Sequence, residues 1–388
     1  MAKKIKSHNS SKINILHIIT DLDIGGSEIM LIKLLYHLKK DRFKNFVVSL
    51  KSNNPLKKFL KDKNILIYEL NLDYSRNKFN KVLNLLKIIK NYKPDIIHTL
   101  LYHADLIGII IGKFILNKKV IWNIRCSNMN LKKYGKSGYL VFKLCSNLSN
   151  FPNSIIFNSE IGKYYHINKG YCPKESYIIP NGFDLSVFKP DNIKRELFRA
   201  KYNINKNCIC IGIASRYDMM KDHDNFLMAA SLIKNKLKNI KFLMCGNNVD
   251  PDNKDLISKI NYYDLHKNVI LLGKLSNIIP FYQSLDIYCS SSSFGEGFPN
   301  AVGEAMACGV PCVVTDVGDC KKIVKGVGLV VPPKNSNELS KAMLKLINMS
   351  KQERKSLGLK AREKIKKNYD IKNIVKQYEN LFIKIARI

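Results

Sequence analysis

The chain has 388 residues, more than one ordinary hydrophobic core accommodates, so two domains are expected. Hydrophobic residues make up 46% of the sequence and charged residues 25%, a globular composition, and the net charge is +34. No apolar run reaches the roughly 18 residues that a membrane span needs, because Lys113 interrupts the nearest candidate, DLIGIIIGKFIL (105–116). The apolar stretch after the basic N-terminus is too short for a signal peptide, so we expect a cytoplasmic protein.

The positive charge is spread along the chain, with a net +20 in residues 1–190 and +14 in residues 191–388. It reflects either a compositional bias toward Lys, Asn and Ile or an anionic partner, such as a membrane surface at the inner membrane face or a phosphorylated substrate. A nucleic-acid partner is not expected, because zinc and RNA-binding signatures are missing from the sequence. The ten cysteines are scattered without a Cys-x-x-Cys pair, which predicts buried thiols rather than a disulfide framework or a metal site.

Strand-like and helix-like segments alternate through the first half of the chain. The apolar run KINILHIIT (12–20) precedes a loop with Gly25 and Gly26 and then the helical pattern IMLIKLLYHLKK (29–40). A strand, a glycine loop and a helix in this order begin a nucleotide-binding type of unit. Five more strands are predicted, separated by helix-length segments: NFVVSL (45–50), ILIYEL (65–70), DIIHTL (95–100), VIWNIR (120–125) and SIIFNS (154–159).

The alternation is interrupted at YIIPNGFDLSVFKPDN (177–192), where Pro, Asn and Gly predict turns and a boundary. A second series of predicted strands follows: CICIGIAS (208–215), IKFLMCG (240–246), NVILLG (268–273), LDIYCS (285–290), PCVVTD (311–316) and GLVV (328–331). The pattern predicts an α/β protein with parallel sheets covered by helices. We expect one domain over residues 1–185, a second over 186–370, and a separate amphipathic helix over 371–388.

The stretch GEGFPNAVGEAMACGVP (295–311) contains its own helix signals. Pro299 suits the first turn of a helix, and Gly309 suits the position just after its end. Glu296 then lies in the preceding loop and Glu304 on the second turn. Because a helix N-terminus attracts phosphate and carboxylates accept hydrogen bonds from diols, the pattern favours a seat for a sugar nucleotide. The alternative is two surface carboxylates on an ordinary helix.

This stretch resembles the Glu-x7-Glu signature of the retaining family-4 glycosyltransferases. The segments GGSE, YIIPNGFD, ASRYDMMKD and GLVVPP occur in the order found in that family, so the resemblance covers nearly the whole chain. It implies the GT-B fold, in which two Rossmann-like doubly wound domains face each other across a cleft. It also implies that the C-terminal helix returns to the N-terminal domain; the alternative is a helix that closes the second domain.

The resemblance implies a role for each residue that matches the family's motifs. Glu296 would contact hydroxyls of the donor sugar, Glu304 would bind the ribose hydroxyls, and Arg216 and Lys221 would neutralise the diphosphate leaving group. The remaining donor-binding positions would act through their backbone: Gly25, Gly26, Gly297, Phe298, Pro299 and Asn300. The alternative for Arg216 and Lys221 is that they are solvated cations.

The sequence departs from the family after the strand VIWNIR, where many members carry a histidine that touches the donor sugar. Arg125 occupies the aligned position and becomes a possible sugar or acceptor contact. His103 is an alternative polar group at the end of a neighbouring strand, either as a ligand contact or in a local structural hydrogen bond. His98, inside that strand, is expected to be structural.

The resemblance implies a retaining glycosyltransferase of the hexosyltransferase type. Such an enzyme moves a sugar from a nucleoside-diphosphate donor to a glycan or polyprenyl-linked acceptor in the assembly of a lipopolysaccharide O-chain or capsule. No cofactor or metal is expected, since two cations and helix amides stabilise a departing phosphate. The alternative is a catalytically silent GT-B module that only binds a partner.

Overall fold

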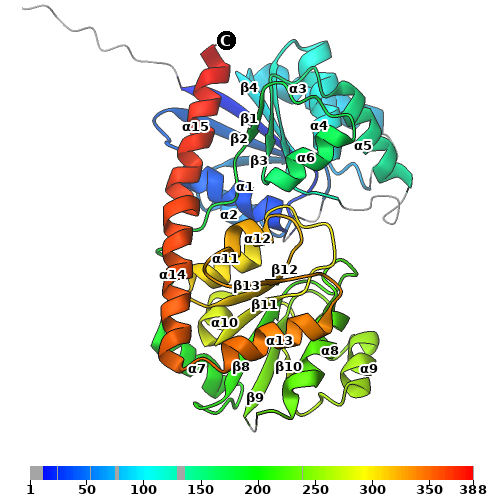
Figure 1. Cartoon of the computed structure of the whole chain (residues 1–388). Helices are drawn as coiled ribbons and strands as arrows, with labels where there is room; N and C mark the ends of the chain where they lie inside the picture. The colour runs from blue at the N-terminus through cyan, green and yellow to red at the C-terminus, as the bar shows by residue number, and fades with distance from the viewer. Residues whose placement is uncertain are drawn as a thin grey trace, which may run out of the picture.

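The computed structural model describes most of the chain, namely residues 12–23, 25–52, 54–74, 78–128, 136–237 and 239–387, with only the backbone of Lys78, Phe79 and Lys136. The described residues form two sheet-based units stacked end to end (Figure 1). Every strand pairing within the two sheets is parallel, as expected for apolar strands that are covered on both faces.

The first unit is built on a seven-stranded sheet in the order β3-β2-β1-β4-β5-β6-β7. Its strands are mainly apolar, and the central ones are buried because helices lie on both faces of the sheet. Their bounds are β1 (Ile13–Ile19), β2 (Phe43–Ser49), β3 (Leu66–Glu69), β4 (Ile96–Leu100), β5 (Lys119–Ile124), β6 (Ser154–Phe157) and β7 (Ser176–Ile178).

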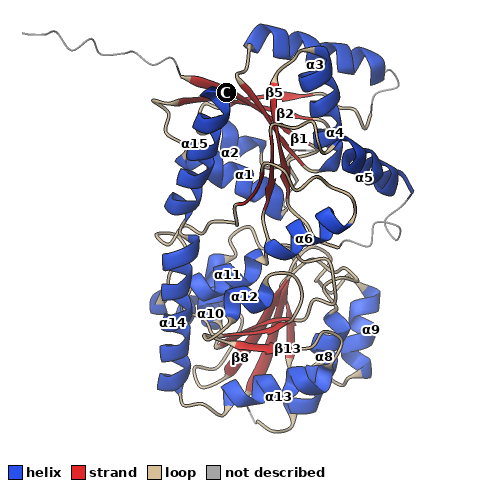
Figure 2. Ribbon diagram, turned by 45° about the horizontal axis from the view of Figure 1, so that its top comes forward, coloured by secondary structure: helices blue, strands red, loops and turns tan. Residues whose placement is uncertain are grey.

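The helices of this unit divide between the two faces of the sheet. One apolar core joins the sheet to α1 (Gly26–His37), α2 (Lys57–Lys61) and α15 (Ile371–Arg387). The core on the opposite face involves α3 (Lys78–Tyr92), α4 (Tyr102–Ile107), the π-helix η1 (Gly108–Ile115), α5 (Lys136–Leu148) and α6 (Glu160–Asn168). Figure 2 shows the sheet between these two layers.

The second unit has a six-stranded sheet in the order β10-β9-β8-β11-β12-β13. The strands are β8 (Ile209–Ala214), β9 (Ile240–Cys245), β10 (Val269–Leu271), β11 (Ile287–Ser290), β12 (Cys312–Thr315) and β13 (Leu329–Val331). One face packs on α8 (His223–Lys234), α9 (Lys254–Tyr262) and α13 (Ser336–Ile347). The other packs on α7 (Asn192–Lys201), α10 (Ile279–Ser284), α11 (Asn300–Ala307), α12 (Cys320–Val324) and α14 (Lys351–Tyr369).

The chain crosses between the two units twice, and the two crossings lie side by side. Phe183 N donates to Tyr369 O at 2.9 Å, and Ile371 N donates to Phe183 O at 3.0 Å. Helix α14 therefore ends on the second unit and α15 begins on the first, as the two red-orange helices in Figure 1 show. The domain boundaries expected at residues 185 and 370 stay predictions.

The α/β prediction with two Rossmann-like units is confirmed, and so is the return of the C-terminal helix to the first unit. Strand β7 was missed, because it is only three residues long and overlaps the segment interpreted as turns. All ten cysteines are free thiols. None of the helices in the described part of the chain combines the length and the apolar content needed to cross a membrane.

Candidate active site

A pocket lies at the carboxyl ends of β8 and β11, where the loops after these strands meet the start of α11. Ser215, Lys221, Ser292, Glu296 and Pro299 are among the residues that line it. Carboxyl ends of parallel strands share one edge of a sheet, which is the usual place for a ligand in this kind of fold. Lys221 and Glu296 are 75 positions apart in the sequence, and the fold brings them together here.

The centre of the pocket is an ion pair between Lys221 Nζ and Glu296 Oε1. Ser292 Oγ also donates to Glu296 Oε1, at 2.7 Å, and the Glu296 residue is only 8% exposed. Burial raises the pKa of Glu296, but the charge of Lys221 and the hydrogen bonds from Lys221 and Ser292 outweigh it, so the pKa lies below its usual value. Glu296 is therefore a buried carboxylate that keeps its negative charge at neutral pH.

Arg216 lies on the same loop as Lys221 but at the surface of the site. Its side chain is half exposed, and its Nε donates to Asp218 at 3.1 Å. The loop is tied to the β11 side of the pocket, since Ser293 N donates to Met220 O at 2.8 Å and Ser291 Oγ donates to Lys221 O at 2.8 Å. Arg216 is thus a half-exposed cation, paired with Asp218, on a loop that is held beside the Lys221–Glu296 pair.

Helix α11 points its N-terminus at this pocket. Pro299 is the N-cap residue and makes no side-chain cap, so the first N–H groups of the helix have no side-chain oxygen from that residue. Gly309 follows the helix with a φ of +75°, the left-handed conformation that ends it, as predicted from the sequence. An uncapped N-terminus with partial positive charge is a suitable seat for phosphate.

Glu304 lies one turn further along α11, with its carboxylate at the boundary between the two units. Tyr282 Oη donates to Glu304 Oε2 at 2.9 Å, and Lys33 Nζ of α1 lies 3.7 Å from Glu304 Oε1. Burial raises the pKa of Glu304, although Lys33 and the Tyr282 hydrogen bond partly oppose this. Its side chain retains 13% exposure, so it is accessible from the boundary rather than sealed in the core.

The glycine loop of the first unit lies opposite α11. Gly25 is the N-cap of α1, and a Cβ placed on Gly26 would come within 2.5 Å of Asn300 Nδ2. A side chain at residue 26 would therefore displace the Asn300 amide, so glycine lets the two units approach here without moving it. Glu28 of the same GGSE motif was given no role from the sequence; it is 7% exposed, and burial raises its pKa to about 7.

The loop before α11 contacts the first unit through its backbone. A Cβ on Gly297 would lie 2.9 Å from Asn158 Oδ1, and Ser127 Oγ donates to Glu296 O. The Phe298 side chain is buried against Tyr369, with ring centroids 5.2 Å apart, so only its backbone could reach a ligand. Pro299 has no N–H group to offer, which leaves the amides of Gly297, Phe298 and Asn300.

The two residues proposed as sugar or acceptor contacts occupy different environments. His103 is on the exposed side of α4, and partial burial and nearby Lys51 lower its pKa. Arg125 is 8% exposed, and its NH1 group donates to Asn123 Oδ1 at 3.2 Å and to Tyr378 Oη at 3.1 Å. The NH1 side of its guanidinium is thus held by residues of the first unit.

Residues that could bind a metal do not converge in the parts of the chain that the structure describes: no three His, Cys, Asp or Glu side chains there form such a group. The site consists instead of a carboxylate, cations and helix amides. This set suits an anionic ligand that also carries hydroxyl groups.

Two family models match the sequence and together span most of it. The model described as Glycosyltransferase Family 4 matches residues 24–187, and the model described as Glycosyl transferases group 1 matches residues 194–364. The two matches correspond to the first and second sheet units.

Named proteins and solved structures agree with these matches. The putative glycosyltransferase EpsF of Bacillus subtilis is 24% identical, over 83% of this chain and 84% of its own length. The N,N'-diacetylbacillosaminyl-diphospho-undecaprenol alpha-1,3-N-acetylgalactosaminyltransferase of Campylobacter jejuni is 26% identical, over 83% and 86%. HepE of Anabaena, solved with UDP-glucose, superposes with a TM-score of 0.83 at 20% identity, over 96% of this chain and 100% of HepE, so the GT-B fold is shared. The chain belongs to the family-4 glycosyltransferases.

Proposed function

We propose that this glycosyltransferase transfers a sugar from a nucleoside-diphosphate donor to a glycan or polyprenyl-linked acceptor, with retention of configuration. The observation that carries the proposal is the Lys221–Glu296 ion pair beside the uncapped N-terminus of α11, with Glu304 on the same helix. A buried carboxylate, a partly buried cation and the amides of an uncapped helix N-terminus match a ligand with hydroxyls at both ends and a diphosphate between them.

The donor would lie across the start of α11. Its diphosphate would contact the N-terminal amides of the helix and the cations Arg216 and Lys221. Glu304 would accept hydrogen bonds from the ribose hydroxyls, and Glu296 from hydroxyls of the transferred sugar. Both carboxylates are ionisable groups in partly buried positions, where a hydrogen bond to a hydroxyl is stronger than in water.

In the transfer step, the bond between the anomeric carbon and the phosphate oxygen breaks, and its electron pair leaves with the diphosphate. The acceptor hydroxyl oxygen bonds to the anomeric carbon from the same face, and its proton passes to the departing phosphate oxygen. Lys221, Arg216 and the helix amides would stabilise the charge that develops on the leaving group, without a metal ion. Same-face attack preserves the anomeric configuration.

The names of several relatives support an acceptor carried by a lipid. The Campylobacter protein acts, by its name, on a diphospho-undecaprenol substrate, and CapH of Staphylococcus aureus, 23% identical, is named for capsular polysaccharide biosynthesis. We therefore assign this chain to the assembly of a cell-surface polysaccharide, such as a lipopolysaccharide O-chain or a capsule.

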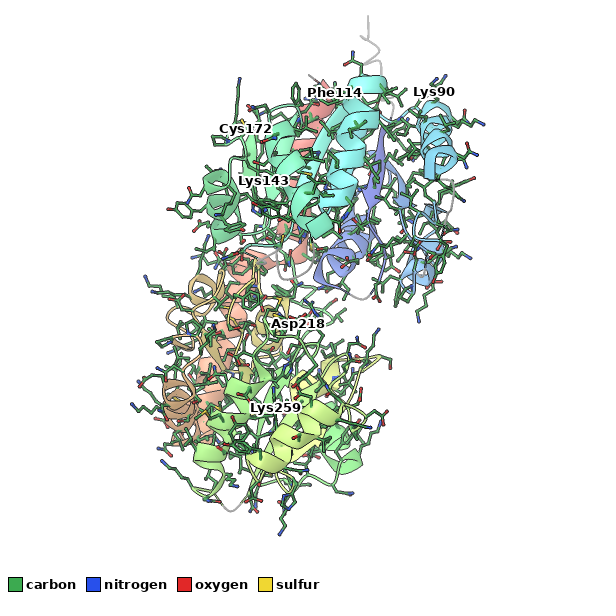
Figure 3. The ribbon with its side chains drawn as sticks, turned by 90° about the vertical axis from the view of Figure 1, so that its right-hand side faces the viewer. Lys90, Phe114, Lys143, Cys172, Asp218 and Lys259 are labelled. Carbon is green, nitrogen blue, oxygen red and sulfur yellow. The ribbon has the colours of Figure 1, made fainter. Side chains whose placement is uncertain are left out.

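A lipid-linked acceptor requires access to a membrane surface, and η1 with α5 provides a suitable face. No acidic residue occurs between Asp105 and Glu160, and η1 and α5 contribute the cations Lys113 and Lys143. Large apolar side chains are exposed on η1, α5 and the loop after α5: Ile110, Phe114, Ile115, Leu140, Leu144 and Phe151. Phe114 and Lys143 lie on neighbouring helices on the near side of Figure 3. This η1–α5 face suits an anionic bilayer at the inner membrane face.

Turnover with a panel of UDP-, GDP- and ADP-sugars tests the proposal. We expect at least one donor to be hydrolysed slowly and to be transferred when a lipid-linked acceptor is supplied. Binding of a nucleotide sugar without hydrolysis or transfer would favour a catalytically silent module. Absence of both binding and turnover with every donor would refute the proposed function.

A further inference from the structure

A row of hydrogen-bonded polar side chains, three of them buried, crosses the first sheet beneath α15. It runs through Asn45 of β2, His17 of β1, His98 of β4 and Asn123 of β5, four strands that are neighbours in the sheet. His17 Nε2 is 3.0 Å from Asn45 Oδ1, the Nδ1 atoms of His17 and His98 are 3.0 Å apart, and His98 Nε2 is 3.1 Å from Asn123 Nδ2. The two histidines are fully buried and Asn123 is 1% exposed.

The donor and acceptor groups of these side chains fix the direction of the hydrogen bonds along the row. Arg125 can only donate, and its NH1 group occupies Asn123 Oδ1 at 3.2 Å. Asn123 therefore donates from Nδ2 to His98 Nε2, which leaves the His98 proton on Nδ1 to be donated to His17 Nδ1. His17 in turn donates from Nε2 to Asn45 Oδ1. Both imidazoles are neutral in this arrangement, in agreement with burial, which lowers the pKa of His17 to about 4.

The other arm of the Arg125 guanidinium leads to the second unit. Its NH2 group donates to Asn181 Oδ1, in the segment that joins the two units, and Asn181 Nδ2 donates to Asn300 Oδ1. Asn300 is the first residue of α11, so its amide lies at the proposed phosphate seat. Because Asn300 Oδ1 faces Asn181, Asn300 Nδ2 faces the glycine loop. There it would lie 2.5 Å from a Cβ placed on Gly26.

We infer that Arg125 is a positioning residue of the donor site, which acts through Asn181 to set the direction of the Asn300 side-chain amide. With this direction, the N–H donors of Asn300 rather than its carbonyl oxygen are presented at the start of α11. A phosphate oxygen accepts hydrogen bonds, so Nδ2 attracts the donor diphosphate whereas Oδ1 would repel it. The identity of the ligand rests on the proposed function; the direction of the hydrogen bonds does not.

A purely structural role explains the row poorly. Apolar side chains would fill the same space without the cost of burying a guanidinium and several amide and imidazole groups. Much of this cost is offset by the hydrogen bonds of the row, and Tyr378 Oη of α15 accepts from both Arg125 NH1 and Asn123 Nδ2 at 3.1 Å, although Arg125 Nε is buried without a partner among the described residues. The result is a rigid support for one side chain at the donor site.

The substitution Asn181→Asp tests the positioning of Asn300, because it removes one hydrogen-bond donor and leaves the shape of the side chain nearly unchanged. The carboxylate still accepts from Arg125, but it has no N–H to donate to Asn300, whose amide should then turn its Oδ1 toward the phosphate seat. We expect kcat/KM for the best donor of the sugar-nucleotide panel to fall roughly tenfold, the effect of about one hydrogen bond, while the melting temperature stays the same or rises. The control is Asn335→Asp, which adds the same charge at the N-cap of α13 and preserves the cap. Unchanged kcat/KM in Asn181→Asp would overturn the inference.

Nitrogen-15 NMR of the histidine side chains measures their tautomers and so tests the inference without any measurement of turnover. In the ligand-free chain we expect His98 protonated on Nδ1 and His17 on Nε2, and Arg125→Met should disturb the His98 tautomer. The opposite tautomers in the unaltered chain, or no response to Arg125→Met, would overturn the inference and leave the proposed function intact. If the Arg125→Met variant fails to fold, the histidine tautomers of the unaltered chain still test the inference. The expected tautomers without turnover of any donor would refute only the proposed function.

Discussion

The Glu296 carboxylate keeps its charge in a buried position because Lys221 lies against it. In the proposed complex, the donor diphosphate would attract Lys221 as well, so the ion pair would loosen when the donor binds and leave Glu296 free to accept from the sugar hydroxyls. Lys221 would then contribute more to the transition state, in which the leaving phosphate carries the most charge, than to the binding of the donor.

Lys221→Ala should therefore lower kcat about 100- to 1,000-fold and change KM much less, the size of effect seen when one stabilising group is removed from a developing oxyanion. Steady-state kinetics with the best sugar nucleotide checks this. Lys254→Ala, an exposed lysine on α9, serves as the matched control. A change confined to KM would contradict the assignment of Lys221 to the leaving group.

Glu304→Gln should weaken the affinity for the nucleoside diphosphate. Loss of a hydrogen bond to a charged group costs about 1.5–3 kcal/mol, roughly a ten- to hundredfold change in affinity. Calorimetric titration with UDP, GDP and ADP measures the effect, and Glu363→Gln on the exposed surface of α14 provides the comparison. Equal affinities in the two variants would remove Glu304 from the ribose site.

For single residues, the sequence predicts which side chains carry the chemistry of the site but not which residues contact them. The spacing of Glu296 and Glu304 indicated a ligand site because both lie in one short motif. The partners Lys33 and Tyr282 could not be predicted, since each meets Glu304 only through the tertiary fold. The same holds for Asn181 and Asn300, which are 119 positions apart.

Among the elements, α11 depends on small residues to fit between the linker and the second sheet. A Cβ on Gly303 would lie 2.0 Å from the Phe183 ring. We expect Gly303→Ala to lower the free energy of unfolding by about 1–3 kcal/mol, because the ring must move. Gly138→Ala, in α5 with open space around it, should instead raise it by up to about 1 kcal/mol. Denaturant unfolding compares the two, and equal effects would contradict the close packing of α11.

Long apolar strands and amphipathic helices were predicted correctly because burial imposes their pattern. Strand β7 was not, since three residues at the edge of a sheet carry too short a pattern to separate from a turn. The last two helices also show the limit of a local pattern. The capping box of Ser350 and Glu353 begins α14, and only the pairing of Phe183 with Asp370 fixes where α14 ends and α15 crosses back.

For the whole molecule, the proposed membrane face predicts association with anionic vesicles. Co-sedimentation with phosphatidylglycerol vesicles should exceed that with phosphatidylcholine and weaken as salt rises. The triple variant Phe114→Ser, Leu140→Ser, Leu144→Ser should lose most of this binding but keep slow donor hydrolysis. The control replaces exposed apolar residues of the second unit, Ile193→Ser, Leu197→Ser and Tyr262→Ser. Equal binding by both variants would contradict the assignment of the η1–α5 face.

A crystal structure of the chain with a bound nucleoside diphosphate is the most direct test of the central claim. We predict the diphosphate at the N-terminus of α11, in contact with Lys221 and Arg216, and the ribose hydroxyls on Glu304. A nucleotide bound elsewhere, with the Lys221–Glu296 pair and the start of α11 untouched, would contradict it.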